Sequence, residues 1–598
     1  MHVWDNECFL GIEKSATGRA WRARLADGEK ARTLGLRCDL PELLARVLAG
    51  RDIDAPQAEA FLQPTLKAHM PDPAILRDGE KAAARIAKAI TDGEKITVFG
   101  DYDVDGGTSS ALLKLFFVSV GCDADIYIPN RLTEGYGPNK EALEELANSG
   151  TQLLITVDCG VTSHDVIGDV HQQMDVVIID HHLADENLPR AHAIVNPNRR
   201  DDISGLGYLA AVGVSFLMVV LINRVLRDCG WYHQERCEPD LLKWLDLVAL
   251  GTICDVVPLV GLNRAYVAQG LKVLGARQNI GLRALADAAG LEKRPDTYAA
   301  GFILGPRINA AGRLGHSELG SRLLSTDDEI IATDIAAELH ELNRQRRDIE
   351  QRVLDQAFVQ AEAETKGGQL PTVLICSGDS WHSGVVGIVA GRLKDKFKRP
   401  AFAIGFDDKG IGTGSGRSLS GVDLGGAVKA AVEAGVLEKG GGHEMAAGLT
   451  IKREQLGAFR AFLDQRLKCE VEKAHKHLGF LIDGAVSASG VTLDLLAMLE
   501  RAGPYGIGNP EPRFVLPAHR IVYAARVGED HVRCTLVSGE GARINAIAFR
   551  SRGTALDQFL LDKPATPVHI AGKLKLNEWR GRRDVQMIIE DAALPMTL

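Results

Sequence analysis

The chain has 598 residues, a formal net charge of −10, 45% hydrophobic residues and 25% charged residues. A chain of this length and apolar content can bury several cores, roughly four domains at about 150 residues each, which excludes global disorder and fibrous repeats. Its ten cysteines include no Cys-x-x-Cys pair, so zinc ribbons and disulfide frameworks are disfavoured and a reducing, cytoplasmic compartment is favoured.

Residues 1–90 predict an N-terminal helical segment without a chemical motif, and the first residues lack the basic cluster and apolar run of a signal peptide. Between residues 91 and 325, short apolar runs alternate with helical patterns. Strands are predicted at 96–99, 125–128, 153–157 and 176–179, and helices at 108–120, 141–149 and 165–172. Continuous Val/Ile runs separated by helices indicate a parallel sheet that is covered on both faces.

The stretch 205–222 is uncharged and 18 residues long, which fits a membrane span on length alone. It contains three glycines and a tyrosine, so we expect a buried helix in a large domain and no membrane partner. Residues 326–365 predict one long connecting helix, with apolar positions spaced between charges and a capping box that pairs Ser325 with Asp328.

A second, smaller α/β unit is predicted over 366–468, with strands at 372–376 and 401–404 around a helix at 385–397. Residues 469–598 contain short β-rich segments at 520–524, 531–537 and 568–575, which favour a small OB-type barrel. Residues 501–598 hold 14 Lys and Arg against 10 Asp and Glu, whereas the rest of the chain is acidic. This bias suits a polyanion-binding tail on a carboxylate-rich body, but a neutral protein also shows such a bias by chance.

Acidic and histidine residues follow several strands of the first unit at the point where each strand ends. These residues are Asp101, Asp103, Asp105, Asp158, Asp180, His181 and His182. Ligands bind at the carboxyl ends of strands in an open parallel sheet, so we expect these side chains to converge. Clustered carboxylates would repel one another without a cation, and oxygen ligands with histidine suit Mn²⁺ or Mg²⁺.

Each of these features also has a simpler interpretation. The Asp-x-Asp-x-Asp-Gly run could be a calcium loop, but its twelfth position is Leu112 where such a loop needs an acid. A single aspartate at a strand end is usually a helix cap, and an isolated His-His pair usually lies on the surface. Their coincidence at matching strand ends favours a metal site.

The runs GDYDVDG (100–106), VDCG (157–160) and DHH (180–182) resemble the first three motifs of the DHH phosphoesterase superfamily. The run KGGGHEMAAG (439–448) resembles the GGGH signature of its DHHA1 partner domain. With the barrel tail and the runs at 305–313 and 381–389, the chain is similar to the RecJ single-strand-specific 5′→3′ DNA exonucleases. This resemblance implies an α/β fold with a parallel-sheet DHH domain (91–325), a connecting helix (326–365), a smaller α/β DHHA1 domain (366–468) and an OB-like nucleic-acid-binding domain (469–598).

The resemblance also implies a catalytic centre with two ions of Mn²⁺ or Mg²⁺. Asp103 and Asp158 would hold one ion, and Asp105, Asp158, His181 and Asp255 would hold the other. His182 would lie beside the scissile phosphate. Many superfamily members place a metal-binding histidine where this chain has Phe99, and Asp101 could supply the missing ligand. Two such ions can activate a water and stabilise the leaving oxygen of an in-line displacement.

Digestion of a DNA strand from one particular end requires a protein group that recognises that end. By itself the glycine-rich run 410–418 predicts a plain turn, but in the RecJ-like setting its Ser415 and Arg417 resemble a 5′-phosphate anchor assisted by Arg131. The other substrate-binding candidates implied by the matching motifs are Tyr136, Arg307, Asn309, Arg313, His382 and His443. These residues could instead act as helix caps or form interdomain salt bridges, and this alternative is strongest for Arg307. Candidates for strand contacts in the tail are Tyr505, Phe514, Tyr523, Trp579, Arg580, Arg582 and Arg583.

The function implied is metal-dependent hydrolysis of single-stranded DNA from its 5′ end to 5′-mononucleotides, in DNA repair and recombination. The same setting implies a single-strand-binding protein and a helicase as partners. One alternative is a superfamily phosphodiesterase that acts on short oligoribonucleotides or cyclic dinucleotides, and the long helix and extra tail argue against so small a substrate. The other is a non-catalytic single-strand-binding relative, against which the complete set of metal ligands argues.

Overall fold

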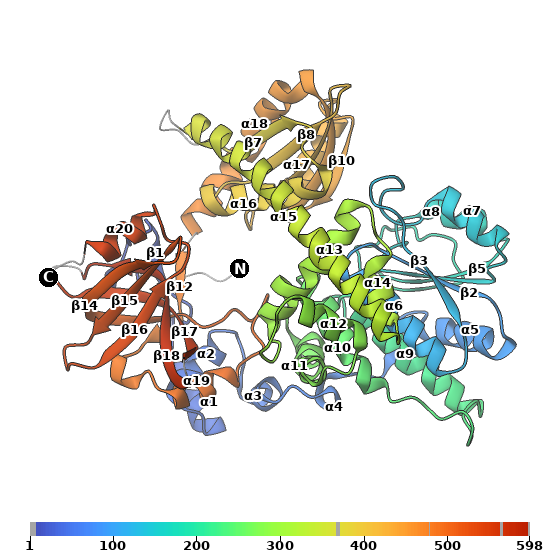
Figure 1. Cartoon of the computed structure of the whole chain (residues 1–598), viewed down its shortest axis with the longest axis horizontal. Coiled ribbons are helices and arrows are strands. Elements are labelled where there is room, and N and C mark those ends of the chain that lie inside the picture. The colour runs from blue at the N-terminus through green and yellow to red at the C-terminus, as the bar shows by residue number, and fades with distance from the viewer. Residues whose placement is uncertain (1–7, 366–370, 478, 563–565, 580, 596–598) are drawn as a thin grey trace.

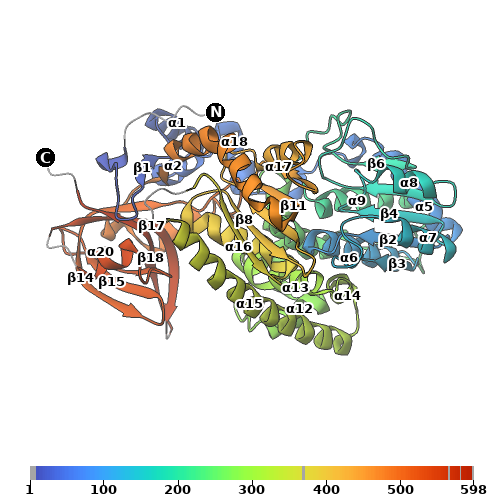
Figure 2. The ribbon, with the colours of Figure 1, turned by 90° about the horizontal axis from the view of Figure 1, so that it is seen from above.

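The computed structural model describes residues 8–365, 371–477, 479–562, 566–579 and 581–595. Figure 1 shows a parallel sheet with helices at the right, a second sheet at the top and a β-barrel at the left. Figure 2 shows the same lobes from above, with the long helix α15 (Glu329–Thr365) leading from the first lobe to the second. The predicted α/β class with a connecting helix and a C-terminal barrel is confirmed.

The N-terminal region, predicted as a helical segment, is mostly helical but also includes a strand. Strand β1 (Ala20–Ala23) pairs in parallel with β12 (Gly479–Ile482), near the other end of the chain. Trp21 on this strand is fully buried. A short strand whose partner is so distant leaves no local pattern. The helices of this region are η1 (Phe9–Gly11), α1 (Gly28–Cys38), α2 (Glu42–Ala49), α3 (Ala55–Leu62), α4 (Leu66–His69), η2 (Pro73–Ile75) and α5 (Gly79–Asp92).

The first α/β lobe is built on a parallel sheet in the order β3-β2-β4-β5-β6. Strands β2 (Ile96–Gly100) and β4 (Leu153–Val157) are buried along their whole length, which explains their unbroken apolar sequences. The predicted elements between residues 96 and 179 are confirmed within a few residues. The other elements of this sheet and its flanks are β3 (Ala124–Tyr127), β5 (Asp175–Ile179), β6 (Ala193–Val195), α6 (Val104–Ser119), α7 (Lys140–Asn148) and α8 (His164–Val170).

A helical layer completes this lobe. Its first member, α9 (Ala211–Asp228), takes up much of the apolar stretch 205–222 and packs in the main hydrophobic core, as expected. Among the described residues, no helix has the length and apolarity needed to cross a membrane. The other members are η3 (Leu241–Trp244), α10 (Leu245–Cys254), α11 (Gly261–Ala276), α12 (Ile280–Ala288), the π-helical turn η4 (Ala299–Leu304), α13 (Gly305–Leu314) and α14 (Leu319–Ser325).

Helix α15 has 37 residues and is therefore roughly 55 Å long. Its cap differs from the predicted capping box. Asp328 Oδ1 accepts hydrogen bonds from the backbone N–H groups of Ile330 and Ile331, at 2.7 and 3.0 Å. Ser325 belongs to the preceding helix, where its hydroxyl donates to the Ser321 carbonyl. The cap of the helix thus lies three residues later than expected, at Asp328, and the helix begins at Glu329.

The second lobe is a mixed sheet in the order β10-β11-β9-β8-β7. Its strands β7 (Leu374–Asp379) and β8 (Ala401–Phe406) and its helix α16 (Ser383–Phe397) match the predicted unit. The other elements are β9 (Ile411–Arg417), α17 (Leu424–Glu433), β10 (Lys439–His443), β11 (Ala446–Lys452), η5 (Arg453–Gln455) and α18 (Leu456–His477). Helix α18 continues through residues 468 and 469, where we expected a domain boundary.

The glycine-rich run 410–418 is a strand and not the turn that its composition predicts. It forms β9, which pairs with β8 on one side and β11 on the other. A Cβ atom at Gly412 or Gly416 would lie 2.7 Å from Phe406 Cε1 or 2.3 Å from Phe402 Cε1, respectively. The glycines therefore let aromatic rings pack directly against the strand. The residues that alternate with them belong to the opposite face of the sheet.

The C-terminal lobe is a closed barrel with the OB strand order. Strands β14 to β18 pair in the order β14-β15-β16-β18-β17, and β17 pairs with β14 to close it. A helix follows the third of these strands. The elements are β13 (Gly484–Ala485), η6 (Ala488–Gly490), α19 (Leu493–Glu500), β14 (Phe514–Val527), β15 (His531–Val537), β16 (Arg543–Ala548), α20 (Ala555–Leu561), β17 (Val568–Trp579) and β18 (Arg582–Ala593). This confirms the predicted barrel.

The N-terminal helices attach the barrel to the first lobe. Apolar side chains of residues 25–61 and of the barrel form one hydrophobic cluster. Arg264 on α11 is buried beneath them, with its guanidinium 3.7 Å from the centre of the Phe61 ring. It donates to the Phe61 carbonyl and to the Ala502 carbonyl, both at 2.9 Å. A charged group paired in this way fixes the barrel relative to the α/β lobe.

Candidate active site

The candidate metal ligands lie where the direction of strand succession reverses in the parallel sheet. Strand β2 is flanked by β3 on one side and β4 on the other, so the connections leave in opposite directions at the β2/β4 boundary. Ligands bind at this point in open α/β sheets. Asp101 directly follows β2, Asp158 directly follows β4, and His181 lies two residues after the end of β5. The convergence expected from the sequence therefore exists in the fold.

The structure brings all six predicted ligands together in overlapping groups. Asp101, Asp103 and Asp158 form one group, and Asp105, His181 and Asp255 form another, each with ligand atoms within 4.8 Å of one another. His181 Nε2 lies 3.3 Å from Asp158 Oδ1, 3.7 Å from Asp255 Oδ2 and 3.9 Å from Asp105 Oδ2. Asp158 is therefore placed to join the two groups.

Backbone hydrogen bonds orient these side chains. Asp103 caps α6 by accepting from the Asp105 N–H at 2.8 Å, and Asp105 accepts from the Ala211 and Val212 N–H groups at 2.7 and 2.9 Å. His181 Nδ1 lies 3.0 Å from the Leu209 carbonyl oxygen. A carbonyl can only accept, so this bond puts the proton on Nδ1 and leaves the Nε2 lone pair toward the carboxylates, as in metal-binding histidines.

Burial first, and then repulsion between neighbouring carboxylates, raises the pKa values of four of these aspartates. The pKa of Asp105 rises to about 7 and that of Asp255 to about 9, while the pKa values of Asp101 and Asp158 lie well above their usual range. Burial lowers the pKa of His181 to about 4, which keeps its imidazole neutral. The cluster thus resists negative charge unless a cation accompanies it.

Three buried ligand atoms of this cluster have no hydrogen-bond partner among the described residues, namely Asp101 Oδ1, His181 Nε2 and Asp255 Oδ2. Buried polar atoms without partners are costly, and a cation would satisfy all three. Oxygen ligands with imidazole nitrogen match Mn²⁺ or Mg²⁺. The residues present therefore fit a site for two divalent ions.

Asp180 lies outside these groups, whereas His182 borders them: Asp158, His181 and His182 form a third group of possible ligands, also with ligand atoms within 4.8 Å of one another. Asp180 accepts from the His181 N–H at 2.7 Å and lies 2.8 Å from His182 Nδ1. Burial alone would favour its neutral form, but these bonds lower its pKa. The Tyr136 hydroxyl donates to the Asp158 carbonyl at 3.2 Å and lies 3.4 Å from His182 Nδ1. Asp180 therefore positions His182 at the edge of the metal cluster.

Phe99 does not face an empty ligand position. Its side chain is fully buried in an apolar cluster, with its ring centre 5.2 Å from that of Tyr127. Asp101, two residues further on, lies with Asp103 and Asp158 instead. The position that carries a histidine in many superfamily members here belongs to the hydrophobic core, and a carboxylate from the neighbouring turn completes the group.

Three arginines of the predicted substrate site gather beside the carboxylates. The Arg131 guanidinium lies 4.8 Å from the centre of the Tyr102 ring. Burial, followed by the charges of neighbouring arginines that include Arg131 and Arg417, lowers the pKa of Arg313 to about 10. Its Nη1 donates to the Gly384 carbonyl of the second lobe at 2.8 Å. Mutually repelling cations of both lobes next to an acidic cluster form a natural site for phosphate groups.

The second lobe contributes Ser415 and Arg417 from β9. Arg417 Nη1 donates to Ser415 Oγ and to the Gly416 carbonyl, both at 2.8 Å. Helix α16 passes closely over them, and a Cβ atom at Gly387 would lie 3.0 Å from Arg417 Nη2 and 3.1 Å from Ser415 Oγ. Gly387 lies in the run 381–389 that carries the family resemblance, but the sequence alone assigned it no role, because the side chains it makes room for are distant in the chain. Sequence reasoning missed the Leu209 carbonyl and the α9 N–H groups, which are backbone atoms.

Other predicted substrate residues have different surroundings. Arg307 donates to the Ile303 carbonyl at 2.6 Å, and burial and then the charge of Arg347 of α15 lower its pKa. His382 Nδ1 accepts from the Gly384 N–H at 3.0 Å and caps α16, the alternative role that the sequence allowed. Asn309 is partly exposed on α13, and His443 is exposed on β10.

Of the barrel residues that were predicted to contact single-stranded DNA, some are buried and others are exposed. Phe514 is fully buried, so base stacking on its ring is excluded. Tyr505 is half-buried and donates its hydroxyl to the Leu499 carbonyl. Tyr523 is exposed, with the Arg533 guanidinium 5.9 Å from its ring centre. Arg582 and Arg583 are also exposed. Arg580 and the side chain of Trp579 lie outside the described residues.

Three family models match the chain. The DHH family N-terminal domain matches residues 95–252, the DHHA1 domain matches residues 370–468, and the RecJ OB domain matches residues 482–591. These matches correspond to the parallel-sheet lobe, the mixed-sheet lobe and the barrel.

Individual proteins give the same result over nearly the whole chain. The single-stranded-DNA-specific exonuclease RecJ of Dickeya dadantii is 36% identical over 561 residues, covering 92% of this chain and 96% of that protein. The crystal structure of RecJ from Thermus thermophilus in complex with Mn²⁺ has a TM-score of 0.78 at 30% identity, covering 96% of this chain and 79% of that one. Its Mg²⁺ complex has a TM-score of 0.72 at 28% identity, covering 96% and 78%. On these matches, together with the ligand geometry, the chain belongs to the RecJ family.

Proposed function

We propose that this protein is a metal-dependent exonuclease that hydrolyses single-stranded DNA in the 5′→3′ direction and releases 5′-mononucleotides. The observation that carries the proposal is the pair of ligand groups joined at Asp158, with arginines from two lobes beside them. The relatives named single-stranded-DNA-specific exonuclease, and the RecJ structures in complex with Mn²⁺ and Mg²⁺, support both the substrate and the metals.

The residues of the site have distinct roles in metal binding and phosphate binding. We assign Asp101, Asp103 and Asp158 to one ion and Asp105, Asp158, His181 and Asp255 to the other. When bound, the two ions supply Lewis-acid stabilisation of the charge that develops on the attacked phosphate and the leaving oxygen. His182, held by Asp180 through its Nδ1 edge, is placed to hydrogen-bond the phosphate through its other edge. The network of backbone hydrogen bonds holds these groups before substrate arrives, which limits reorganisation during the reaction.

The arginines beside the metal ligands would set the direction in which the DNA strand is digested. Arg417 and Ser415 would bind the terminal 5′-phosphate, with Arg131 facing them from the first lobe. A terminal phosphate anchored there places the next phosphodiester bond at the metal ligands. Cleavage one nucleotide from the end gives a 5′-mononucleotide and a new terminal phosphate. The cycle can then repeat along the strand.

The barrel and the complete ligand set favour this function over the two alternatives. A phosphodiesterase for cyclic dinucleotides or short oligoribonucleotides has no need for a barrel that is fixed to the catalytic lobe by a buried arginine. A non-catalytic binding relative has no need for ligand atoms kept in register by the backbone. We propose a cytoplasmic role in DNA repair and recombination, where a helicase would supply single strands and a single-strand-binding protein would cover them.

The test is hydrolysis by the purified protein with Mn²⁺, using single-stranded DNA, double-stranded DNA and RNA labelled at either end. We expect 5′-mononucleotides to appear from single-stranded DNA and to stop appearing when a chelator is added. Release from the 3′ end, or activity confined to oligoribonucleotides or cyclic dinucleotides, would overturn the proposal.

A further inference from the structure

Two aromatic side chains lie exposed and stacked on the first lobe, where no hydrophobic core accounts for them. Tyr298 is 61% exposed and Phe302 is 67% exposed. Their ring centres are 5.2 Å apart and their planes meet at 24°, so the rings form a nearly parallel pair. Large aromatic rings are normally buried because they remove much apolar surface from water. A pair left in water presents π-faces to something outside the chain.

The pair belongs to a continuous helical element that reaches the metal ligands. Tyr298 precedes the π-helical turn η4, and α13 continues directly from it to Leu314. At the far end, a Cβ atom at Gly312 would lie 2.8 Å from the Tyr102 carbonyl oxygen, and Arg313 lies near Asp103. The stretch from residue 299 to residue 313 is about 21 Å long at 1.5 Å per residue.

This element also packs closely against the helix that carries a metal ligand. Cys254 Sγ lies 3.7 Å from the Ala300 carbonyl, and a Cβ atom at Gly305 would lie 2.4 Å from Cys254 Sγ. Cys254 is the residue immediately before Asp255. The aromatic pair is therefore fixed relative to the metal ligands and not carried on a separate loop.

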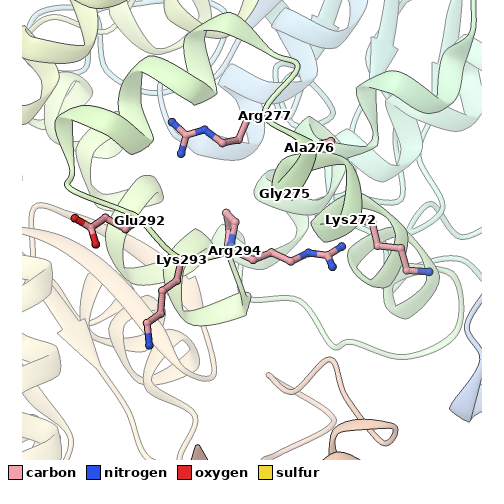
Figure 3. A pocket seen from close by; sticks show the side chains of 8 residues that line it. Lys272, Gly275, Ala276, Arg277, Glu292, Lys293 and Arg294 are labelled. Atoms are coloured by element: carbon pink, nitrogen blue, oxygen red, sulfur yellow. The ribbon is translucent and has the colours of Figure 1, made fainter. Parts of the chain in front are cut away.

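The segment just before this helical element lines a basic pocket that extends to the barrel. This pocket has a volume of about 400 Å³. Figure 3 shows the side chains that line it, among them Lys272, Arg277, Lys293 and Arg294, with Glu292 as the one acidic lining residue. Lys293 Nζ lies 3.1 Å from Glu578 Oε2 on β17 of the barrel. Arg294 lies four residues before Tyr298. The pocket and the aromatic pair therefore belong to adjacent segments of the chain.

We propose that Tyr298 and Phe302 are a base-stacking platform for the single strand on its way from the barrel to the metal ligands. The basic residues of the pocket, Lys272 and Arg294 among them, would bind the backbone phosphates of the same segment. The inference rests on the proposed function, because it takes single-stranded DNA as the substrate. Alternating cationic and aromatic contacts are how proteins hold single strands without reading their sequence. A protein partner would also cover aromatic rings, but the surrounding excess of cations favours a polyanion.

The experiment measures equilibrium binding of fluorescently labelled, 5′-phosphorylated single strands by anisotropy, with a chelator present to prevent hydrolysis. Strands of about 2 and about 16 nucleotides are compared, because the helical element between the platform and the metal ligands, about 21 Å long, is longer than a dinucleotide. The Tyr298→Ala/Phe302→Ala protein should bind the longer strand roughly tenfold to a hundredfold more weakly and the shorter strand normally. Val359→Ala, on α15 and 69% exposed, is the matched control and should bind both strands normally.

Two further comparisons separate stacking from other contacts. Tyr298→Phe/Phe302→Tyr keeps both rings and should keep the affinity, whereas Tyr298→Leu/Phe302→Leu keeps apolar bulk and should lose most of it. In longer strands with one abasic position, the wild-type protein should lose affinity at particular positions. The double alanine protein should show no further loss at those positions, because the stacking partner is already missing.

Each outcome is decisive. Unchanged binding of the longer strand by the double alanine protein would overturn the platform and leave a protein partner as the occupant of the pair. Full affinity in the leucine protein would overturn stacking. If the wild-type protein bound no single-stranded DNA, the proposed function would fail and this inference with it, whereas wild-type binding with unaffected variants would overturn this inference alone.

Discussion

Arg417→Ala tests whether the second lobe reads the 5′ end of the strand. In the structure the Arg417 guanidinium donates to Ser415 Oγ and to a backbone carbonyl, which aims the remaining N–H groups of its planar fork. A hydrogen bond to a charged group typically contributes about 1.5–3 kcal/mol. At about 1.4 kcal/mol per tenfold change, its loss should lower kcat/KM on 5′-phosphorylated strands by roughly one to two decades.

The substitution should leave the fold intact. Burial, and then the charge of Arg131, lowers the pKa of Arg417, which means that its charged form is not stabilised where it lies. Removal of this guanidinium therefore relieves repulsion as well as breaking two hydrogen bonds. We expect the melting temperature to change little, so that a loss of activity reports on substrate binding.

The assay compares rates on oligonucleotides that differ only in a 5′-phosphate or a 5′-hydroxyl. Arg417→Ala should reduce the preference for the phosphate, because the lost partner is the phosphate itself. Arg392→Ala on α16 is the control: its side chain is 53% exposed and its nearest acidic partner, Glu350, lies 3.7 Å away. Equal losses on both oligonucleotides would remove Arg417 from the anchor, and faster digestion from the 3′ end would refute the assigned polarity.

Three further outcomes are expected. Asp158→Ala removes the ligand shared by both groups and should abolish hydrolysis and weaken Mn²⁺ binding measured by calorimetry; activity within tenfold of wild type at saturating metal would contradict the site. Sequence reasoning suggests that Phe99→His would tighten metal binding, but the ring is buried against Tyr127, so we expect thermal denaturation to show a loss of about 1–3 kcal/mol and no gain in Mn²⁺ affinity. Burial raises the pKa of Asp246 to about 7, so wild-type stability is penalised increasingly as pH rises from about 4 to about 7. Asp246→Asn should therefore be more stable than wild type at pH 8, by up to about 4 kcal/mol, and the advantage should vanish near pH 4; a pH-independent difference would exclude this cause.

Local sequence pattern is sufficient to predict the layered α/β architecture and the kind of chemistry at its centre. Unbroken Val and Ile runs such as 153–157 require two covered faces, and that requirement is local to each strand. Acids at the ends of parallel strands must meet at one edge of the sheet, so the pairing of Asp101 with Asp158 follows from the pattern of strands. Asp255 could be identified as a metal ligand only from its motif. It lies at the end of a helix, and the sequence of that helix has no distinctive pattern.

The tertiary structure alone determines which atoms surround each of these side chains. The proton position on His181 depends on the Leu209 carbonyl, and the strand β9 exists because aromatic rings from β8 fill the space above its glycines. The core position of Phe99 and the exposure of Tyr298 and Phe302 also depend on contacts between distant segments. Local pattern fixes periodicity and the direction of a strand, because these are properties of consecutive residues. Solvent exposure and hydrogen-bond partners are set by residues far away in the chain, and no periodicity records them.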